Sequence, residues 1–356
     1  TNSSNEKALA LPNGGVAVSS TLLDTTTFTE LDKVELALAS QLARLLVSNE
    51  NSLRKLIDTL NPSGSLENVT IAPSEDAEAP FTLSGVLNNV SVQPWSGAPG
   101  LSGVDGLLTL GKLSGQVVVN SSTETAMYFP RIYSAPLAFS EIEGTVTWRV
   151  EDSRYFVGAK DIVARSTVSN ALFGGQFAVN GGIKRGQEAT QLMLNLGVTN
   201  AKAEELLQYI PYVAPDTLTQ WVSGSELSGD VSRGVFLYNG STRAAETKLR
   251  SIDAFFRVHD GDLIYYPEWS RVSHVDAGVL VSDSAVAVEV YSGESSGIRL
   301  TEGLIDVVYG GAEKYVGVSG KTKGDIGAVL AFMNNAPLPV DSVSYTHLRA
   351  HETSID

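Results

Sequence analysis

The stretch Gly144-Thr145-Val146-Thr147-Trp148-Arg149-Val150 alternates between apolar and polar side chains. A period of two is typical of a β-strand with one face on a core and the other towards solvent. The same alternation recurs at residues 81–87, 107–110, 114–119 and 285–290, and Gly, Asn and Ser separate such stretches. The sequence therefore predicts a mainly β protein whose strands form a sandwich, a barrel or a long open sheet.

A few segments carry a helical pattern instead. Apolar residues recur at i, i+3 and i+4 spacing from Glu30 to Leu46, with Thr29 as the N-cap, and again from Ser52 to Leu60. These segments predict a helical region over residues 29–62. Shorter patterns at residues 201–209 and 217–222 predict a helical insert near 201–222.

Two parts of the chain resemble each other around a tryptophan. Val92-Gln93-Pro94-Trp95 is followed by Val104-Asp105-Gly106 and a strand that ends at Val119. Tyr266-Pro267-Glu268-Trp269 is followed by Val275-Asp276-Ala277-Gly278 and a strand that ends at Val290. Repeated modules stack because one module cannot bury its apolar face alone, so the repeat favours the long sheet. Chance similarity between β sequences is the alternative.

Composition excludes several classes of partner and chemistry. The formal charge is −15, from 25 Lys and Arg against 40 Asp and Glu. Such a balance argues against nucleic acid and against adsorption to an anionic membrane surface. Any lipid contact would therefore be made through acyl chains. The chain has no cysteine, which excludes disulfides and thiolate sites.

The two ends of the chain differ from the rest. Residues 1–28 begin with Thr1-Asn2-Ser3-Ser4 and are expected to be a poorly ordered or partial N-terminal segment. Residues 341–356 break the β pattern and resemble a translated sequencing adapter; a natural disordered tail is the alternative. Between them we expect a first β module at 63–200, the helical insert at 201–223 and a second β module at 224–340.

The motifs that would carry catalysis lack their structural context. Gly293-Glu294-Ser295-Ser296-Gly297 fits a nucleophile elbow, but residues 298–308 read as a strand where the elbow requires a helix. The acidic stretches at 259–262 and 75–78 lack the spacing of calcium loops. Gly174-Gly175 and Gly181-Gly182 are not followed by the Lys-Ser/Thr of a phosphate-binding loop. The sequence predicts no enzyme activity, no cofactor and no metal site.

Several turns and anchors are similar to the central region of the YhdP family, an AsmA-like, TamB-related group of bacterial envelope proteins. The match includes Leu207-Gln208-Tyr209-Ile210-Pro211 and Leu218-Thr219-Gln220-Trp221-Val222. Glu268 stands where the family usually has glycine, which indicates a divergent member. The motif residues are structural rather than catalytic, and they are Trp95, Gly103, Trp148, Tyr209, Pro211, Trp221, Gly229, Gly234, Gly240, Tyr266, Pro267 and Trp269.

The resemblance implies a fold and a function. Family members are inner-membrane-anchored and reach into the periplasm, with a long, curved antiparallel sheet that forms an open U-shaped groove. The groove is implicated in moving phospholipid towards the outer membrane. This chain would be an interior, periplasmic fragment whose partners are phospholipid acyl chains and the rest of the parent polypeptide. Membrane contact would occur only through segments that this sequence lacks.

The strand pattern indicates which residues would line such a groove. Val117, Val119, Val286, Val288 and Val290 are candidate inward-facing residues, although which strand face lines the groove stays open. A closed side-chain core is the other interpretation of the same valines. It would suit a structural or adhesive β-solenoid of the cell envelope. The four tryptophans either border the groove or anchor turns through an N–H to a backbone carbonyl. A third reading, a glycan-active β-helix, needs paired carboxylates about 5–10 Å apart, and the sequence offers no strong pair.

Overall fold

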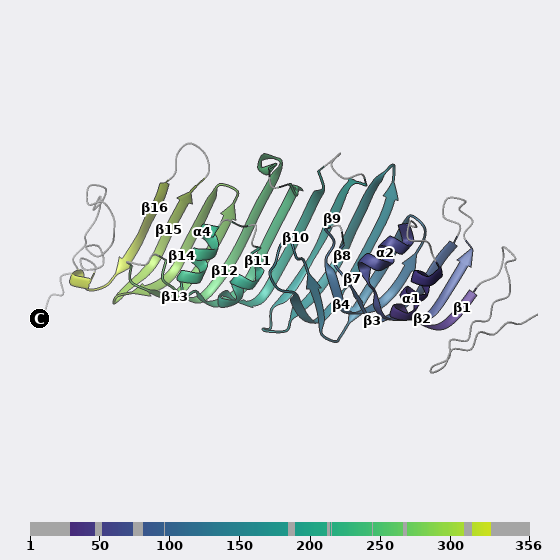
Figure 1. The fold of residues 1–356 in the computed structure, drawn as a ribbon. Helices are drawn as coiled ribbons and strands as arrows, with labels where there is room; N and C mark the ends of the chain where they lie inside the picture. The colour runs from purple at the N-terminus through teal and green to yellow at the C-terminus, as the bar shows by residue number, and fades with distance from the viewer. Residues whose placement is uncertain are drawn as a thin grey trace, which may run out of the picture.

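One antiparallel sheet of sixteen strands contains most of the residues that the structure describes. The computed structural model describes residues 29–46, 52–73, 81–95, 97–183, 189–211, 214, 216–243, 245–265, 269–309 and 315–328. The strands follow chain order from β1 to β16, and only β6 lies off this path, where it pairs with β4 and β7. Figure 1 shows the strands side by side, with α1, α2 and α4 in front of one face of the sheet. The predicted large antiparallel sheet is confirmed.

The strands of the first half are β1 (Thr29–Glu35), β2 (Ser63–Pro73), β3 (Phe81–Val92), β4 (Gly100–Leu110), β5 (Ser114–Ser121), β6 (Thr125–Tyr128), β7 (Leu137–Glu151), β8 (Arg154–Ser166) and β9 (Leu172–Gly182). Those of the second half are β10 (Gln191–Lys202), β11 (Ser228–Ser241), β12 (Arg250–Leu263), β13 (Val272–Ser282), β14 (Ala285–Ser295), β15 (Ile298–Val308) and β16 (Tyr315–Lys323). All five stretches that alternate in the sequence lie in strands. Residues 298–308 also form a strand, so Ser295-Ser296-Gly297 lies in a hairpin and not in an elbow.

Helices α1 to α4 lie in two connections, and a separate 3₁₀ turn (Thr247–Leu249) lies between β11 and β12. The hairpin of α1 (Leu36–Leu46) and α2 (Ser52–Leu60) joins β1 to β2. The insert joins β10 to β11 and contains a 3₁₀ turn (Ala203–Glu205), α3 (Leu206–Tyr209) and α4 (Asp216–Gly224). Both connections were predicted. Their positions define the helical rim of the sheet, which is the line of strand ends that includes Glu35, Ser63, Lys202 and Ser228.

The predicted start of the first helix is wrong. Residues 30–35 belong to β1, where Leu31 lies opposite Val69 and Val34 opposite Leu66. Both Leu31 and Val34 pack on the cluster that contains Val69 and Leu66. The i, i+3 spacing of these two residues also suits a helix, so local pattern alone cannot separate the two states. Pairing with β2 satisfies the backbone and partly buries both side chains, and it overrides the local pattern.

β-Bulges concentrate in the half of the sheet near the helical rim. Register shifts interrupt β2 between Glu67 and Thr70, and β3 between Leu87 and Val90. Equivalent shifts occur in β7 and β8, in β11 to β14, and between β15 and β16. A bulge bends its strand and increases the local twist. The strands therefore share one line of bends that runs along the sheet.

The hydrophobic core follows the same line. Three clusters of buried residues lie near the rim, centred on Val69, Ile142 and Ala277. Their buried members are Leu66, Val69, Leu87, Val90, Val104, Phe139, Ile142, Ala164, Val275, Ala277 and Val290. Leu36 of α1 packs on the first cluster, so this helix lies on the clustered face. We call this face of the sheet the inner face.

The internal repeat is confirmed by two matching bulges. At the first, the Asn89 N–H donates to Asp105 Oδ1 at 2.7 Å; at the second, the Asp260 N–H donates to Asp276 Oδ1 at 3.3 Å. Asn89 and Asp260 both have a φ of 49°. Each pair of equivalent residues is 171 positions apart, as 260 − 89 and 276 − 105 both give. The hairpin β3–β4 is thus repeated as β12–β13.

The repeat extends beyond this hairpin. The pairs Gly106–Val119 and Leu108–Val117 between β4 and β5 recur as Ala277–Val290 and Val279–Val288 between β13 and β14. The helix hairpin recurs too, because the Gln93 N–H donates to Leu60 O and the Ile264 N–H donates to Ser225 O, both at 2.7 Å. The chain therefore contains two copies of one helix-and-strand module within a single sheet.

Candidate functional site

Apolar side chains cover the inner face from one end of the sheet to the other. Because paired residues of neighbouring strands share a face, the strand register traces rows across the sheet. One row runs Leu108, Val117, Val146, Ala159, Phe177, Leu194, Tyr238 and Ile252. Another runs Val198, Gly234, Phe256, Val279, Val288, Ile305 and Val318. Neither row contains a charged residue.

The five candidate valines all lie on this face, in two groups. Val117 and Val119 belong to β5, and Val286, Val288 and Val290 to β14. The repeat makes Val117 equivalent to Val288 and Val119 equivalent to Val290. The structure thus places all five on one continuous surface, although the two strands lie far apart in the strand order.

No second sheet covers the described inner face. Val117, Val119, Val286 and Val288 are only half-buried, by neighbours within the sheet, whereas Val290 at the line of bends is buried. A filled core would bury all of them. The outer face is mixed: it carries polar rows and also the exposed side chains of Met193, Leu237, Phe255, Leu280 and Leu304. The two inner rows traced above carry no charged residue, and the neighbouring row Leu192–Gly240–Arg250 ends on an arginine.

The sequence prediction missed the central part of the inner face. Phe177, Leu194, Phe236 and Phe256 continue the rows between the two valine strands. Alternation was present in the sequence, since Leu192, Leu194, Leu196 and Val198 occupy every second position. That alternation would have identified β10 as a strand that contributes to the inner face.

The family-motif residues act as packing anchors. Trp221 Nε1–H donates to the Tyr265 carbonyl at 3.0 Å, and the rings of Tyr265 and Trp269 meet edge to face at 4.5 Å. Gly103 has a φ of 72° and Gly229 a φ of 131°, in the region that favours glycine. A Cβ at Gly115 would overlap the Trp148 ring, and Gly234 lies against Phe256. The other motif residues are placed as follows: Trp95 pairs with Ala98, Pro211 follows α3, Gly240 is the second-last residue of β11, and Tyr266 and Pro267 lie outside the described residues.

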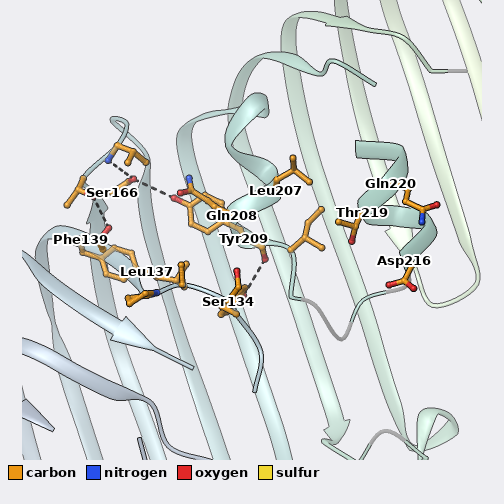
Figure 2. A pocket seen from close by; sticks show the side chains of 17 residues that line it. Ser134, Leu137, Phe139, Ser166, Leu207, Gln208, Tyr209, Asp216, Thr219 and Gln220 are labelled. Atoms are coloured by element: carbon orange, nitrogen blue, oxygen red, sulfur yellow. Dashed lines mark hydrogen bonds between the residues drawn. The ribbon is translucent and has the colours of Figure 1, made fainter. Parts of the chain in front are cut away.

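A cavity of about 570 Å³ opens where the two modules meet. Its walls are residues 133–139, the β8–β9 turn and the α3–α4 insert, and Figure 2 shows Phe139, Tyr209 and Asp216 around it. Phe173 stacks between Phe139 and Tyr209, with ring centroids at 6.2 and 5.1 Å. Burial raises the pKa of Tyr209, and its hydroxyl donates to Ser166 Oγ at 3.5 Å. These contacts hold the insert against the preceding module.

Two histidine–aspartate pairs lie at the second bulge. His274 Nδ1 is 2.7 Å from Asp260 Oδ1, and His259 Nδ1 is 3.2 Å from Asp276 Oδ1. The hydrogen bond that His274 donates to the Asp260 carboxylate raises the pKa of His274 above its usual 6.5. In the first copy Gly103 occupies the position of His274. These side chains stabilise the bulge, and across the described ranges no group of three or more His, Asp or Glu is arranged to hold a metal ion.

None of the described helices is both long and apolar enough to cross a bilayer. A protein-family model with the description "YhdP protein" matches residues 6–347. No curated protein and no solved structure matches the chain.

Proposed function

Because the chain belongs to the YhdP family, we propose that it is part of a periplasmic, bridge-like lipid carrier of the bacterial envelope. The inner face would form the floor and wall of a groove that shields phospholipid acyl chains between the inner and outer membranes. The proposal assigns no catalytic step and no cofactor to the chain. Its partners are lipid tails and the rest of the parent polypeptide.

One observation carries the proposal: the two rows traced along the inner face are apolar and uncharged, and among the described residues only the helices near the rim lie over that face. An exposed apolar surface of this extent marks a binding surface in a soluble protein. Val117 and Val288, in the two copies of the module, belong to the same kind of surface. A ligand can therefore meet equivalent contacts at successive places along the sheet.

The energetics suit a long apolar ligand. Each methylene removed from water contributes roughly 0.8 kcal/mol, so a lipid tail carries a large barrier to travel through water. The inner face lowers this barrier through burial alone. Burial is non-directional, so a tail can shift along the rows without breaking specific bonds.

Site-specific photocrosslinking tests the proposal. A benzophenone amino acid replaces Val117 or Val288 on the inner face, and in matched controls Val118 or Ala287, the next residues in the same strands on the outer face. We expect both inner positions to crosslink phospholipid in cells and in vesicle mixtures, and the outer positions to give little product.

Equal labelling of the inner and outer positions, or no lipid adduct at either inner position, would overturn the proposal. The alternative, a structural or adhesive β-solenoid with a filled core, predicts the second result. No observation favours that alternative, because β1 and β16 lie at opposite ends of an open strand order.

A further inference from the structure

Two arginines lie side by side on the outer face of the second module. Arg233 of β11 and Arg257 of β12 are directly opposite each other in the register, next to the inner-face pair Gly234–Phe256. Opposite residues have Cβ atoms about 5 Å apart, so the two guanidinium groups can reach the same ligand. Like charges in this arrangement repel each other and destabilise the sheet. Stability of the sheet therefore does not account for the pair.

Neither arginine is paired with a carboxylate in the part of the chain that the structure describes. Arg233 is exposed and makes no hydrogen bond or ion pair there. Arg257 is half-buried, and its Nη1 is covered without a hydrogen-bond partner among the described residues. A covered donor without an acceptor costs free energy, and an anion that accepts from it would remove this cost.

Tyr291 holds the guanidinium of Arg257 in position. Cζ of Arg257 lies 4.1 Å from the centre of the Tyr291 ring, within the range of a cation–π contact. The Tyr291 hydroxyl in turn donates to Glu289 Oε2 at 2.9 Å. Gly278, opposite Arg257 on β13, leaves room for the ring, because a Cβ there would lie 3.1 Å from the Tyr291 hydroxyl oxygen. A guanidinium fixed in this way loses less freedom when a ligand binds.

The first module has the same row of the outer face without the arginines. In that copy the register runs through Lys33, Glu67, Val86, Leu107 and Val118. In the second copy it runs through Thr199, Arg233, Arg257, Gly278 and Glu289. The last three members of the two rows are each 171 positions apart, as 257 − 86, 278 − 107 and 289 − 118 give, and strand β1 is the structural equivalent of β10.

The comparison separates the fold from the arginines. Glu67, in the place of Arg233, forms an ion pair with Lys33 at 3.5 Å, and an uncharged valine, Val86, stands in the place of Arg257. The same strands and bulge therefore form without a pair of like charges. Because the fold does not require the two arginines, their presence in one copy indicates a binding function.

From this arrangement we propose that Arg233 and Arg257 form a binding site for one phosphate group. A phosphate carries several oxygens around one tetrahedral centre, so it can accept hydrogen bonds from two guanidinium groups at once. It also cancels the repulsion between the two side chains and provides an acceptor for Arg257 Nη1. Inorganic phosphate and a lipid headgroup share this chemistry. The site lies on the face opposite the proposed lipid groove and does not depend on that proposal.

Calorimetric titration of the intact chain with inorganic phosphate tests the site. Ionic strength is held constant with potassium chloride, so that general screening does not change during the titration. We expect saturable binding by the wild type. Arg233→Gln and Arg257→Gln should each weaken it about tenfold, as the loss of a charge-assisted hydrogen bond implies.

Arg149→Gln is the matched control. Arg149 also lies over an aromatic ring, with Cζ 4.2 Å from the centre of Phe156, but it is paired with Glu151. This variant should bind phosphate as the wild type does. Arg233→Gln removes a repulsion, so its thermal unfolding midpoint without phosphate should be no lower than that of the wild type. That measurement separates loss of binding from loss of the fold.

Two further ligands distinguish the sources of the phosphate group. Glycerol 3-phosphate carries the group without acyl chains, and dihexanoyl phosphatidic acid, kept below its micelle concentration, carries it with short chains. Equal affinity for these ligands and inorganic phosphate identifies the free group as the ligand. Tighter binding of the lipid that depends on both arginines identifies a headgroup.

Either of two results would overturn the proposal. One is the absence of saturable phosphate binding by the wild type in the millimolar range. The other is phosphate binding that Arg233→Gln and Arg257→Gln leave as strong as in the wild type and in Arg149→Gln.

Discussion

Glycines on the inner face allow aromatic rings to lie against the sheet. The Trp148 ring covers Gly115 on the neighbouring strand, and the Tyr155 ring covers Gly181 in the same way. A side chain at either glycine would lift the ring away from the backbone. Two of the large rings of the inner face thus lie over a residue without a Cβ.

Gly115→Ala tests this arrangement. The new Cβ overlaps the Trp148 ring, so we expect the free energy of unfolding in urea to fall by about 1–3 kcal/mol, the usual effect of overpacking. Tryptophan fluorescence should report a more exposed Trp148 in the folded state.

Gly111→Ala is the matched control, because a Cβ there meets its nearest atom, Ser114 O, at an ordinary 3.5 Å. Its unfolding midpoint should stay close to that of the wild type. Equal midpoints for all three proteins would show that the Trp148 ring can move at no cost.

For single residues, the sequence predicts which face of the sheet a side chain lies on better than it predicts which side chains it contacts. Alternation placed Val117 and Val119 on the same face, which the register bears out. It could not identify Gly115 as the residue beneath Trp148, because that contact joins two strands through a register that no local pattern encodes.

The bulges show how one element can be built from different residues. Asn89 and Asp260 have the same left-handed backbone, and each donates its N–H to an aspartate on the next strand. The surrounding side chains differ, since the second copy adds His259 and His274. The two bulges share their backbone geometry and the aspartate acceptor, whereas the other side chains around them differ.

Asp105→Ala and Asp276→Ala should therefore have similar effects. Each leaves one bulge N–H without its acceptor, for an expected loss of about 1 kcal/mol in the free energy of unfolding. Asp276 also contacts His259, and Asp105 also accepts a hydrogen bond from Thr123 Oγ1, so the two substitutions should cost about the same. Urea titration of both variants checks this.

Asp306→Ala, in a regular part of β15, provides the baseline for removal of an acidic side chain from the sheet. If either bulge variant is as stable as Asp306→Ala, the shared acceptor is not what holds that bulge.

Element boundaries were the least predictable feature. The bounds of α2 were predicted correctly, because its apolar face and the following Asn61-Pro62 are local signals. It extended α1 into β1, because Leu31 and Val34 fit a helix locally while their actual partners lie on β2. The cavity beside Tyr209 was also beyond prediction, since its walls come from segments far apart in the chain.

The whole molecule is a single layer in which each strand depends on its neighbours. Stability in such an array is close to a sum of nearest-neighbour terms, and the ends open first. Strands β1 and β16 have one described neighbour each, while β8 to β12 have two.

Native-state hydrogen exchange should record this as a gradient. We expect amides of β8 to β12 to exchange most slowly and those of β1 and β16 fastest, with intermediate protection between. Uniform protection would indicate one cooperative unit. Two protected blocks with a weak β9–β10 junction would show that the modules unfold separately.

The long open sheet could be anticipated from alternating strands and the family resemblance. That the sheet continues unbroken through the helical insert could not, because the insert separates β10 from β11 by a long stretch of non-strand sequence. The pairing of those two strands is a non-local contact, and only the register reveals it.

The repeat also determines how far the sheet extends from one copy of the module to the next. From β1 to its equivalent β10, the sheet advances eight steps along the strand order, which corresponds to about 38 Å at the usual strand spacing. Each copy has its bends at the same position along the strands. A further copy would therefore lengthen the sheet and leave its cross-section unchanged. In such a design length and cross-section are set separately, the first by the number of copies and the second by where the extra residue is inserted.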